Sequence, residues 1–222
     1  MIRRMATVII TGANRGIGLE LSRQLEERGD HVIALCRQAS PELRALGVRI
    51  LENVEITDDA ALRRASEELG GTKADILINN AGVFSNETFH SLDFDEIRRS
   101  FEVNAVGPLR VTHALRRHLA PGAKIIFITS RMGSIEDNGS GAYYGYRMAK
   151  AALNMAGVNL AHDFRGRASV AILHPGLVAT RMTGFSGIST EESAAGLIER
   201  IDELQPEDSG GFWHANGERL PW

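Results

Sequence analysis

This chain of 222 residues is poor in cysteine, and that shortage alone excludes two kinds of site. Cys36 is the only cysteine, so neither an intramolecular disulfide nor a metal site built from several thiolates can form. The seven histidines show no spacing typical of metal ligands. We therefore predict no metal site.

The chain also lacks an excess of positive charge and any long apolar run. Its formal net charge is −3 and no basic stripe is apparent, so we predict no nucleic-acid partner. No apolar run approaches the roughly 20 residues that cross a bilayer, which predicts no membrane partner. Arg3 and Arg4 precede the apolar residues 6–10 as in a secretory signal, but Thr11 and Gly12 interrupt the run and no cleavage site follows. We expect a first strand there and a cytoplasmic protein.

Short apolar runs alternate along the chain with longer amphipathic stretches, a pattern typical of an α/β fold. The runs are mostly uninterrupted, as in a sheet that is covered on both faces. The pattern predicts a single-domain Rossmann-type fold over residues 1–222, a doubly wound parallel sheet with helices on both faces. The predicted strands are 6–10, 31–36, 48–51, 76–79, 124–129, 169–174 and 211–213, and the predicted helices are 16–28, 59–69, 93–118, 143–162 and 191–202.

A glycine-rich turn at residues 11–18 follows the first predicted strand and precedes the first predicted helix. Glycines there let the backbone approach a pyrophosphate at the N-terminus of the helix. The spacing of Gly12, Gly16 and Gly18 differs from the usual Gly-x-Gly-x-x-Gly fingerprint. Because of its place between strand and helix, we favour a nucleotide site over a purely structural turn.

The end of the second predicted strand indicates which dinucleotide binds. An NAD-preferring protein places an acid there to hold the ribose 2′-hydroxyl, whereas this chain has Cys36 followed by Arg37. Arg15, inside the glycine turn, can reach the same ribose. Two guanidinium groups suit a 2′-phosphate, so we predict NADP(H) rather than NAD(H), with solvated arginines as the alternative.

Tyrosine and lysine are scarce, at three residues each, yet Tyr146 and Lys150 lie four residues apart in a predicted helix. Residues at this spacing share one helix face. An ammonium group about 4 Å away in a medium of dielectric about 20 favours the phenolate by roughly 4 kcal/mol, or about three pK units. We therefore predict an acid–base pair with a phenol pKa near neutrality. The alternative is an exposed aromatic ring beside a solvated charge.

With these pieces in place, the chain resembles the short-chain dehydrogenase/reductase family from residue 8 to residue 222. Within that family it is most similar to the branch of carbonyl reductases that includes C-factor and sniffer, because of residues 130–135 and of the tail at 211–222. Six segments match family motifs in order: the glycine turn at 11–18, Asn79 to Gly82, Val103-Asn104, Thr129-Ser130, Tyr146 with Lys150, and Pro175 to Thr180.

The resemblance implies hydride transfer between C4 of a nicotinamide and a carbonyl or secondary alcohol of a small molecule. Tyr146 would protonate the developing alkoxide, and Ser130 would hydrogen-bond the same oxygen. Lys150 would bind the nicotinamide ribose and stabilise the tyrosinate. Asn104 would hold a water that links Lys150 to solvent.

The resemblance also implies a set of cofactor contacts. Glu55 stands where many members have an aspartate near the adenine, and residues 181–189, where the substrate lid is expected, form a short stretch. The family often pairs subunits through the helices predicted at 93–118 and 143–162, so a homodimer or homotetramer is expected. The implied contacts are Gly12, Asn14, Arg15, Gly16, Ile17, Gly18, Arg37, Glu55, Asn80, Ala81, Gly82, Tyr146, Lys150, Pro175, Gly176, Val178 and Thr180.

Two other interpretations use the same fold. One is an NADP(H)-sensing regulatory or signalling protein, although a pure sensor needs no acid at the hydride site. The other is an enoyl reductase or epimerase, which fits less well because Ser130 suits a polarised carbonyl oxygen. Substrate identity stays open, because an apolar pocket fits aldehydes, ketones and quinones equally well.

Overall fold

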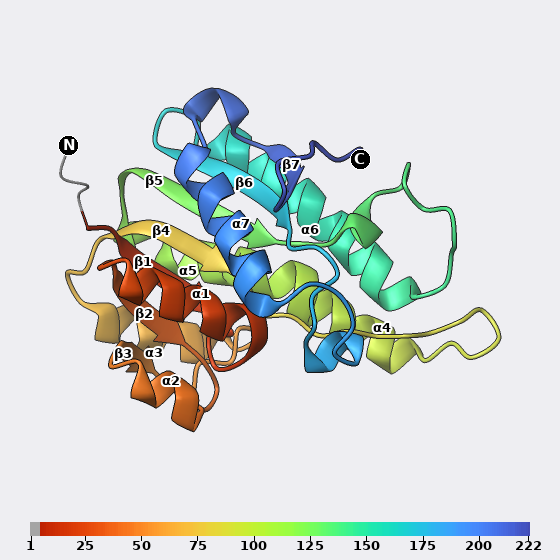
Figure 1. Ribbon diagram of the computed structural model, residues 1–222, viewed down its shortest axis with the longest axis horizontal. Helices are drawn as coiled ribbons and strands as arrows, with labels where there is room; N and C mark the ends of the chain where they lie inside the picture. The colour runs from red at the N-terminus through yellow and green to blue at the C-terminus, as the bar shows by residue number, and fades with distance from the viewer. Residues whose placement is uncertain (1–4) are drawn as a thin grey trace.

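Seven parallel strands form one sheet in the computed structural model, which describes residues 5–222 (Figure 1). The order across the sheet is β3-β2-β1-β4-β5-β6-β7. Arg3 and Arg4, on which the secretory-signal prediction bears, lie outside the described residues. The strands are β1 (Thr7–Thr11), β2 (His31–Leu35), β3 (Arg49–Leu51), β4 (Ala74–Asn79), β5 (Leu119–Ile128), β6 (Ala168–His174) and β7 (Gly211–His214).

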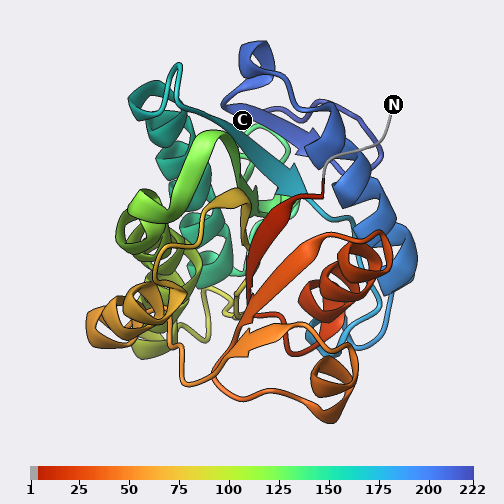
Figure 2. The same ribbon diagram turned by 90° about the vertical axis from the view of Figure 1, so that its left-hand side faces the viewer.

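Helices cover both faces of the sheet (Figure 2). On one face lie α1 (Gly16–Glu27) and α7 (Thr190–Glu203), and on the other lie α3 (Asp59–Leu69), α5 (Gly107–Leu115) and α6 (Tyr144–Asp163). The doubly wound parallel α/β fold is thus confirmed. The limits of the domain at residues 1 and 222 stay a prediction.

The first strand shows why the apolar runs are unbroken. Val8 and Ile10 pack into the same cluster as Leu21 of α1, on one face of the sheet. Ile9 points to the other face and packs with Val111 of α5. Since successive side chains of a strand alternate between faces, a sheet covered twice needs apolar residues at every position.

The segment predicted as a helix at 93–118 is helical from 94 to 118, but it is not one regular α-helix. It consists of α4 (Phe94–Phe101), a π-helical turn at Glu102–Val106, α5 and a 3-10 turn at Arg116–His118. Pro108 gives the physical reason, because its ring would clash with the carbonyl of Asn104 in a regular α-helix and it has no N–H to donate. The widened turn places Asn104 inside it, and that residue is fully buried.

One short helix was absent from the prediction, α2 (Pro41–Ala45). Five residues are too few to show a helical period in the sequence. The signals for it are local: Pro41 opens the helix, and the Ser40 hydroxyl accepts the N–H of Leu43 at 3.1 Å.

Close packing of α6 on the sheet predicts a stability difference between two glycines. A Cβ on the buried Gly157 would lie 2.7 Å from Ile172 Cδ1, whereas one on Gly139 meets nothing within 4 Å. We expect Gly157→Ala to lower the free energy of unfolding by about 1–3 kcal/mol and Gly139→Ala to change it by less than about 0.5 kcal/mol. Urea unfolding of both variants checks this, and equal midpoints would contradict the packing.

Candidate active site

The carboxyl ends of β1, β4, β5 and β6 meet along one edge of the sheet, because these four strands are parallel neighbours. The sheet order changes direction between β1 and β4, and ligands bind beside such a switch in open α/β sheets. The chain leaves these strands at Thr11, Asn79, Ile128 and His174. The predicted motifs follow each of these points.

The glycine turn packs directly against the segment that follows β4. Gly12 has φ +67°, and a Cβ there would lie 2.8 Å from Ala81 Cα. A Cβ on Gly18 would lie 2.4 Å from both the Gly12 carbonyl oxygen and the Asn80 amide nitrogen. Only glycine fits at these two positions, so the turn is a backbone cradle at the start of α1. Asn14 and Ile17 lie in the same turn and are half-buried.

Thr11 ties the two segments together, a role that the motif did not reveal. Its hydroxyl accepts the N–H groups of Asn80 at 3.0 Å and Ala81 at 3.2 Å. The Asn80 side-chain amide donates back to the carbonyls of Thr11 at 3.0 Å and Gly12 at 3.2 Å. Asn80 therefore holds the glycine turn in place.

The loop after β6 approaches the same cradle. A Cβ on Gly16 would lie 3.4 Å from Thr180 Cγ2. The Pro175 carbonyl accepts the Ser193 hydroxyl of α7 at 2.8 Å. Val178 pairs with Ile188, which closes the predicted lid at its base. Gly16 and Thr180 are thus neighbours, and Gly82 and Gly176 follow the ends of β4 and β6 at the same edge of the sheet.

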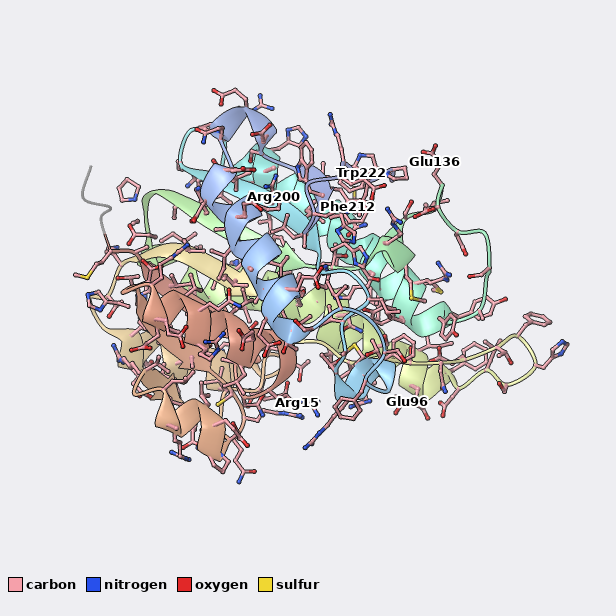
Figure 3. All side chains as sticks on the ribbon, viewed as in Figure 1. Arg15, Glu96, Glu136, Arg200, Phe212 and Trp222 are labelled. Atoms are coloured by element: carbon pink, nitrogen blue, oxygen red, sulfur yellow. The ribbon has the colours of Figure 1, made fainter. Side chains whose placement is uncertain are left out.

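The two arginines predicted to bind the ribose 2′-phosphate lie at the surface. Arg15 is the exposed residue before α1, and it lies at the lower edge of the molecule in Figure 3. Arg37 is 71% exposed and pairs with Glu55 at 3.6 Å. The Glu55 carboxylate, which was expected beside the adenine, partly offsets the charge of Arg37 in this arrangement.

Tyr146 and Lys150 occupy the third and seventh positions of α6, and both are buried, at 8% and 4% exposure. The Lys150 ammonium lies 5.8 Å from the centre of the tyrosine ring and donates to the Ile128 carbonyl at 2.9 Å. A Cβ on Gly133 would lie 2.8 Å from the Lys150 carbonyl carbon. The end of β5 and the turn after it therefore fix Lys150 from two sides.

The predicted lowering of the phenol pKa is wrong for this structure. Burial raises the pKa of Tyr146 to about 12, and a hydrogen bond with Ser130 opposes this to a smaller extent. Burial also lowers the pKa of Lys150 to about 7. Loss of water disfavours the charged form of both groups and outweighs their mutual attraction. Tyr146 therefore keeps its proton at neutral pH.

Ser130 lies beside Tyr146, close enough for its hydroxyl to oppose the effect of burial on the phenol pKa. The Ser130 hydroxyl also accepts the N–H of Met132 at 3.1 Å. The preceding residue, Thr129, donates to Asn154 Oδ1 at 2.7 Å, one turn beyond Lys150. The predicted Ser130, Tyr146 and Lys150 set is thus assembled by contacts between β5 and α6.

The Asn104 side chain forms hydrogen bonds with the segment after β4. Its oxygen accepts the Val83 N–H at 2.9 Å, and its amide donates to the Val83 carbonyl at 2.9 Å and to Ser100 at 3.0 Å. A Cβ on Gly82 would lie 2.9 Å from the Asn104 oxygen and 3.9 Å from Lys150 Nζ. Asn104 is therefore near Lys150, while its role in holding a water stays a prediction.

Phe84 belongs to the site although no sequence pattern indicated it. Its ring centre lies 4.9 Å from that of Tyr146 and 5.5 Å from that of Tyr143. It follows Gly82 by two residues, in a segment that forms neither helix nor strand. The contact gives the phenol an apolar wall.

The C-terminal tail supports the loop that follows Ser130. Arg131 donates to both carboxylate oxygens of Glu218 at 2.8 Å. The N–H of Glu136 donates to the Trp222 carbonyl at 2.8 Å. Trp222 stacks on Phe212 with ring centres 5.4 Å apart, and these residues lie together in Figure 3.

Two histidines lie at the ends of β6 and β7. The rings of His174 and His214 meet edge to face, with centres 4.8 Å apart. Burial lowers the pKa of His174 to about 3, and the charges of His214, Arg131 and Lys150 act in the same direction. The His174 ring is therefore neutral at physiological pH.

Within residues 5–222 no helix is long and apolar enough to cross a membrane. Among the same described residues, no group of three or more His, Cys, Asp or Glu could hold a metal ion. A groove of about 800 Å³ between α3 and α5 includes Leu62, Leu109 and Arg110 among its lining residues. It contains none of the residues predicted to bind cofactor or to act in catalysis.

The lowered pKa of Lys150 predicts a pH-dependent stability. Between pH 7 and the ordinary lysine value of 10.5 the unfolded chain binds more protons than the folded one, so stability rises with pH. The rise from Lys150 approaches at most about 1.4 kcal/mol per pH unit. Urea unfolding of the parent and of Lys150→Met at pH 7, 8 and 9 checks this, because the variant lacks the rise. Parallel pH profiles would contradict it.

Comparisons with known proteins agree with this geometry. The family model described as short chain dehydrogenase matches residues 6–189. The chain is 44% identical to the 1-hydroxy-2-glutathionyl-2-methyl-3-butene dehydrogenase of Rhodococcus sp. (strain AD45) over 226 residues, which cover 98% of this chain and 100% of the relative.

Two solved structures superpose over almost the whole molecule. The NADPH-bound carbonyl reductase from chicken fatty liver has a TM-score of 0.90 and 30% identity, with 99% of this chain and 100% of that chain covered. The carbonyl reductase Sniffer of D. melanogaster has a TM-score of 0.91 and 27% identity over the same shares. The predicted family and its carbonyl reductase branch are confirmed: the chain belongs to the short-chain dehydrogenase/reductase family.

Proposed function

We propose that this oxidoreductase transfers a hydride between NADP(H) and a carbonyl or secondary alcohol of a small molecule. The observation that carries the proposal is the placement of the Ser130 hydroxyl where it acts on the Tyr146 phenol, next to the buried Lys150. Two hydroxyl groups there can both bond one substrate oxygen. A protein that only sensed the cofactor would have no need of this pair.

The residues at the sheet edge fit a dinucleotide. Gly12 and Gly18, where a Cβ would collide with Ala81 or Asn80, let the turn pack on the segment after β4, and the uncapped N-terminus of α1 that follows could bind a pyrophosphate. Arg15 and Arg37 would hold a 2′-phosphate, and the structural relative from chicken fatty liver is NADPH-bound. Thr180 and Lys150 would lie on the nicotinamide side.

Bound NADPH would supply the hydride, and the chain would supply the proton. Tyr146 retains its proton at neutral pH because burial raises its pKa to about 12, so it is in the correct state to donate to an alkoxide. Ser130 would hold the carbonyl oxygen in line with the phenol. Lys150, whose pKa is lowered to about 7, would return a proton to the phenolate after transfer.

The substrate side of the site is apolar. The Phe84 ring packs against both Tyr146 and Tyr143, and the lid exposes Met182 and Phe185. These surfaces favour a substrate with an apolar body beside its carbonyl or alcohol group.

A second candidate reaction is the oxidation of an alcohol that carries a glutathionyl thioether. The relative from Rhodococcus, 44% identical over 98% of this chain, is named for such a compound. In oxidation the proton transfers would run in reverse: Lys150, whose pKa is lowered to about 7, would accept the phenol proton, and the resulting phenolate would take the proton of the alcohol.

Removal of the Tyr146 hydroxyl should abolish most turnover. We expect Tyr146→Phe to lower kcat about 10²–10⁴-fold, the usual contribution of a positioned acid, and to leave the Kd of NADPH within about threefold. The assay follows NADPH oxidation with a panel of aldehydes, ketones and quinones, and NADP⁺ reduction with a glutathionyl alcohol. Unchanged kcat in the variant would remove Tyr146 from the mechanism.

Turnover by the parent protein distinguishes the proposed oxidoreductase from the alternative, a protein that only senses the cofactor. Tight NADPH binding without turnover on any of these substrates would favour a cofactor sensor. The substrate that gives the highest kcat/KM decides between the carbonyl and thioether-alcohol classes.

The arginines should set cofactor preference. We expect Arg15→Ala and Arg37→Ala each to weaken NADPH binding about tenfold or more, as for a lost charged hydrogen bond. The Kd of NADH should stay within about threefold, because NADH lacks the phosphate. Titrations followed by nicotinamide fluorescence measure both, with the exposed Arg98→Ala as the control. Equal weakening of NADPH and NADH binding would contradict the assignment.

A further inference from the structure

The helix that carries Tyr146 begins without a side-chain cap of its own. Its first flanking residue, Tyr143, is left-handed at φ 54° and ψ 43°, and Ala142 before it has φ 55°. Residues with side chains rarely adopt this backbone, which persists where the surroundings hold it. The start of α6 therefore depends on contacts from elsewhere in the chain.

Glu87, in the segment that follows β4, supplies those contacts. Its main-chain carbonyl accepts the N–H of Tyr143 at 2.7 Å. Its carboxylate oxygen Oε2 accepts the N–H of Gly145 at 3.2 Å. The side chain is only 5% exposed, so water does not readily replace it at the helix terminus. One residue thus accepts the N–H of Gly145, which an ordinary N-cap side chain would accept, and the N–H of Tyr143 just before the helix.

Gly145 lets Glu87 come this close. A Cβ at Gly145 would lie 2.8 Å from Ser85 Oγ, 3.0 Å from Glu87 Oε1 and 3.0 Å from Ile97 Cα. The first turn of α6 is therefore pressed between the segment at 84–87 and α4. Tyr146 is the next residue, and its ring already contacts Phe84 of the same segment.

We propose that Glu87 is a positioning residue for Tyr146, which holds the first turn of α6 so that the phenol stays within hydrogen-bond distance of Ser130. Lys150 is held separately, by the Ile128 carbonyl at 2.9 Å and by the close contact with Gly133. Loss of Glu87 should therefore disturb proton transfer and spare cofactor binding. The inference rests on the proposed function for its kinetic consequence.

Three substitutions of Glu87 test this role. Glu87→Gln keeps an oxygen that accepts the Gly145 N–H, Glu87→Asp withdraws the acceptor by one methylene, and Glu87→Ala removes it. We expect kcat to fall about 10–100-fold in the Ala and Asp variants, as for a misplaced catalytic group, and to stay within about threefold in the Gln variant. The Kd of NADPH should stay within about twofold in all three.

The exposed neighbour Asn86→Ala serves as the matched control and should retain parental kcat. A fall in kcat that the Gln variant shares with the Ala variant would overturn the role as acceptor. So would a parallel loss of kcat and NADPH affinity, or parental kcat in both the Ala and Asp variants.

Hydrogen exchange gives a readout that does not depend on activity. Amides at 145–147 should exchange about tenfold faster in the Ala and Asp variants than in the Gln variant, while amides at 153–163 stay unchanged. If the parent reduces no carbonyl and oxidises no alcohol, the proposed function fails and this measurement alone decides the positioning role. Uniform exchange across α6 in every variant would overturn the positioning role. If the Ala variant does not fold, the comparison of the Asp and Gln variants decides.

Discussion

Lys150 places an ammonium group in the interior, next to the carboxyl edge of the sheet, and the surrounding structure depends on holding it there. An ammonium group removed from water is costly unless polar atoms face it. The Ile128 carbonyl faces it directly, at the point where β5 ends. Gly133 lets the turn after β5 pack closely on the helix at Lys150, and Gly82 lets the segment after β4 pack on Asn104 near the nitrogen. Strand, turn and helix are thus arranged around one charge.

Much of this arrangement could be predicted from the sequence, because the periodic and motif signals are local. The strands and the longer helices follow from apolar runs and amphipathic periods, and the strand ends locate the cradle at Gly12 and the set of Ser130, Tyr146 and Lys150. The π-helical turn around Asn104 also had a local signal in Pro108, although the apolar period by itself predicted one continuous helix. Features that depend on sequence periodicity or on neighbouring residues could therefore be predicted from the sequence.

The remaining features depend on contacts between distant segments. Phe84 and Glu87 meet α6 only after the chain has folded, and nothing in their own neighbourhood marks them. The phenol pKa was wrong in direction for the same reason, because the spacing of Tyr146 and Lys150 shows their proximity but not their burial. Burial is a property of the whole core, and here it outweighs the pairwise charge term.

The histidine pair at the ends of β6 and β7 changes how a pH–rate profile of this protein should be read. A rate that varies between pH 6 and 8 is ordinarily attributed to histidine, the side chain whose unperturbed pKa lies there. The pKa of His174, at the end of β6, is lowered to about 3, so it stays uncharged throughout that interval. The pKa of Lys150 is lowered to about 7 and falls within it. In this protein a buried lysine therefore titrates in the range usually assigned to histidine, and an inflection near neutrality fits Lys150 beside Tyr146 better than it fits His174.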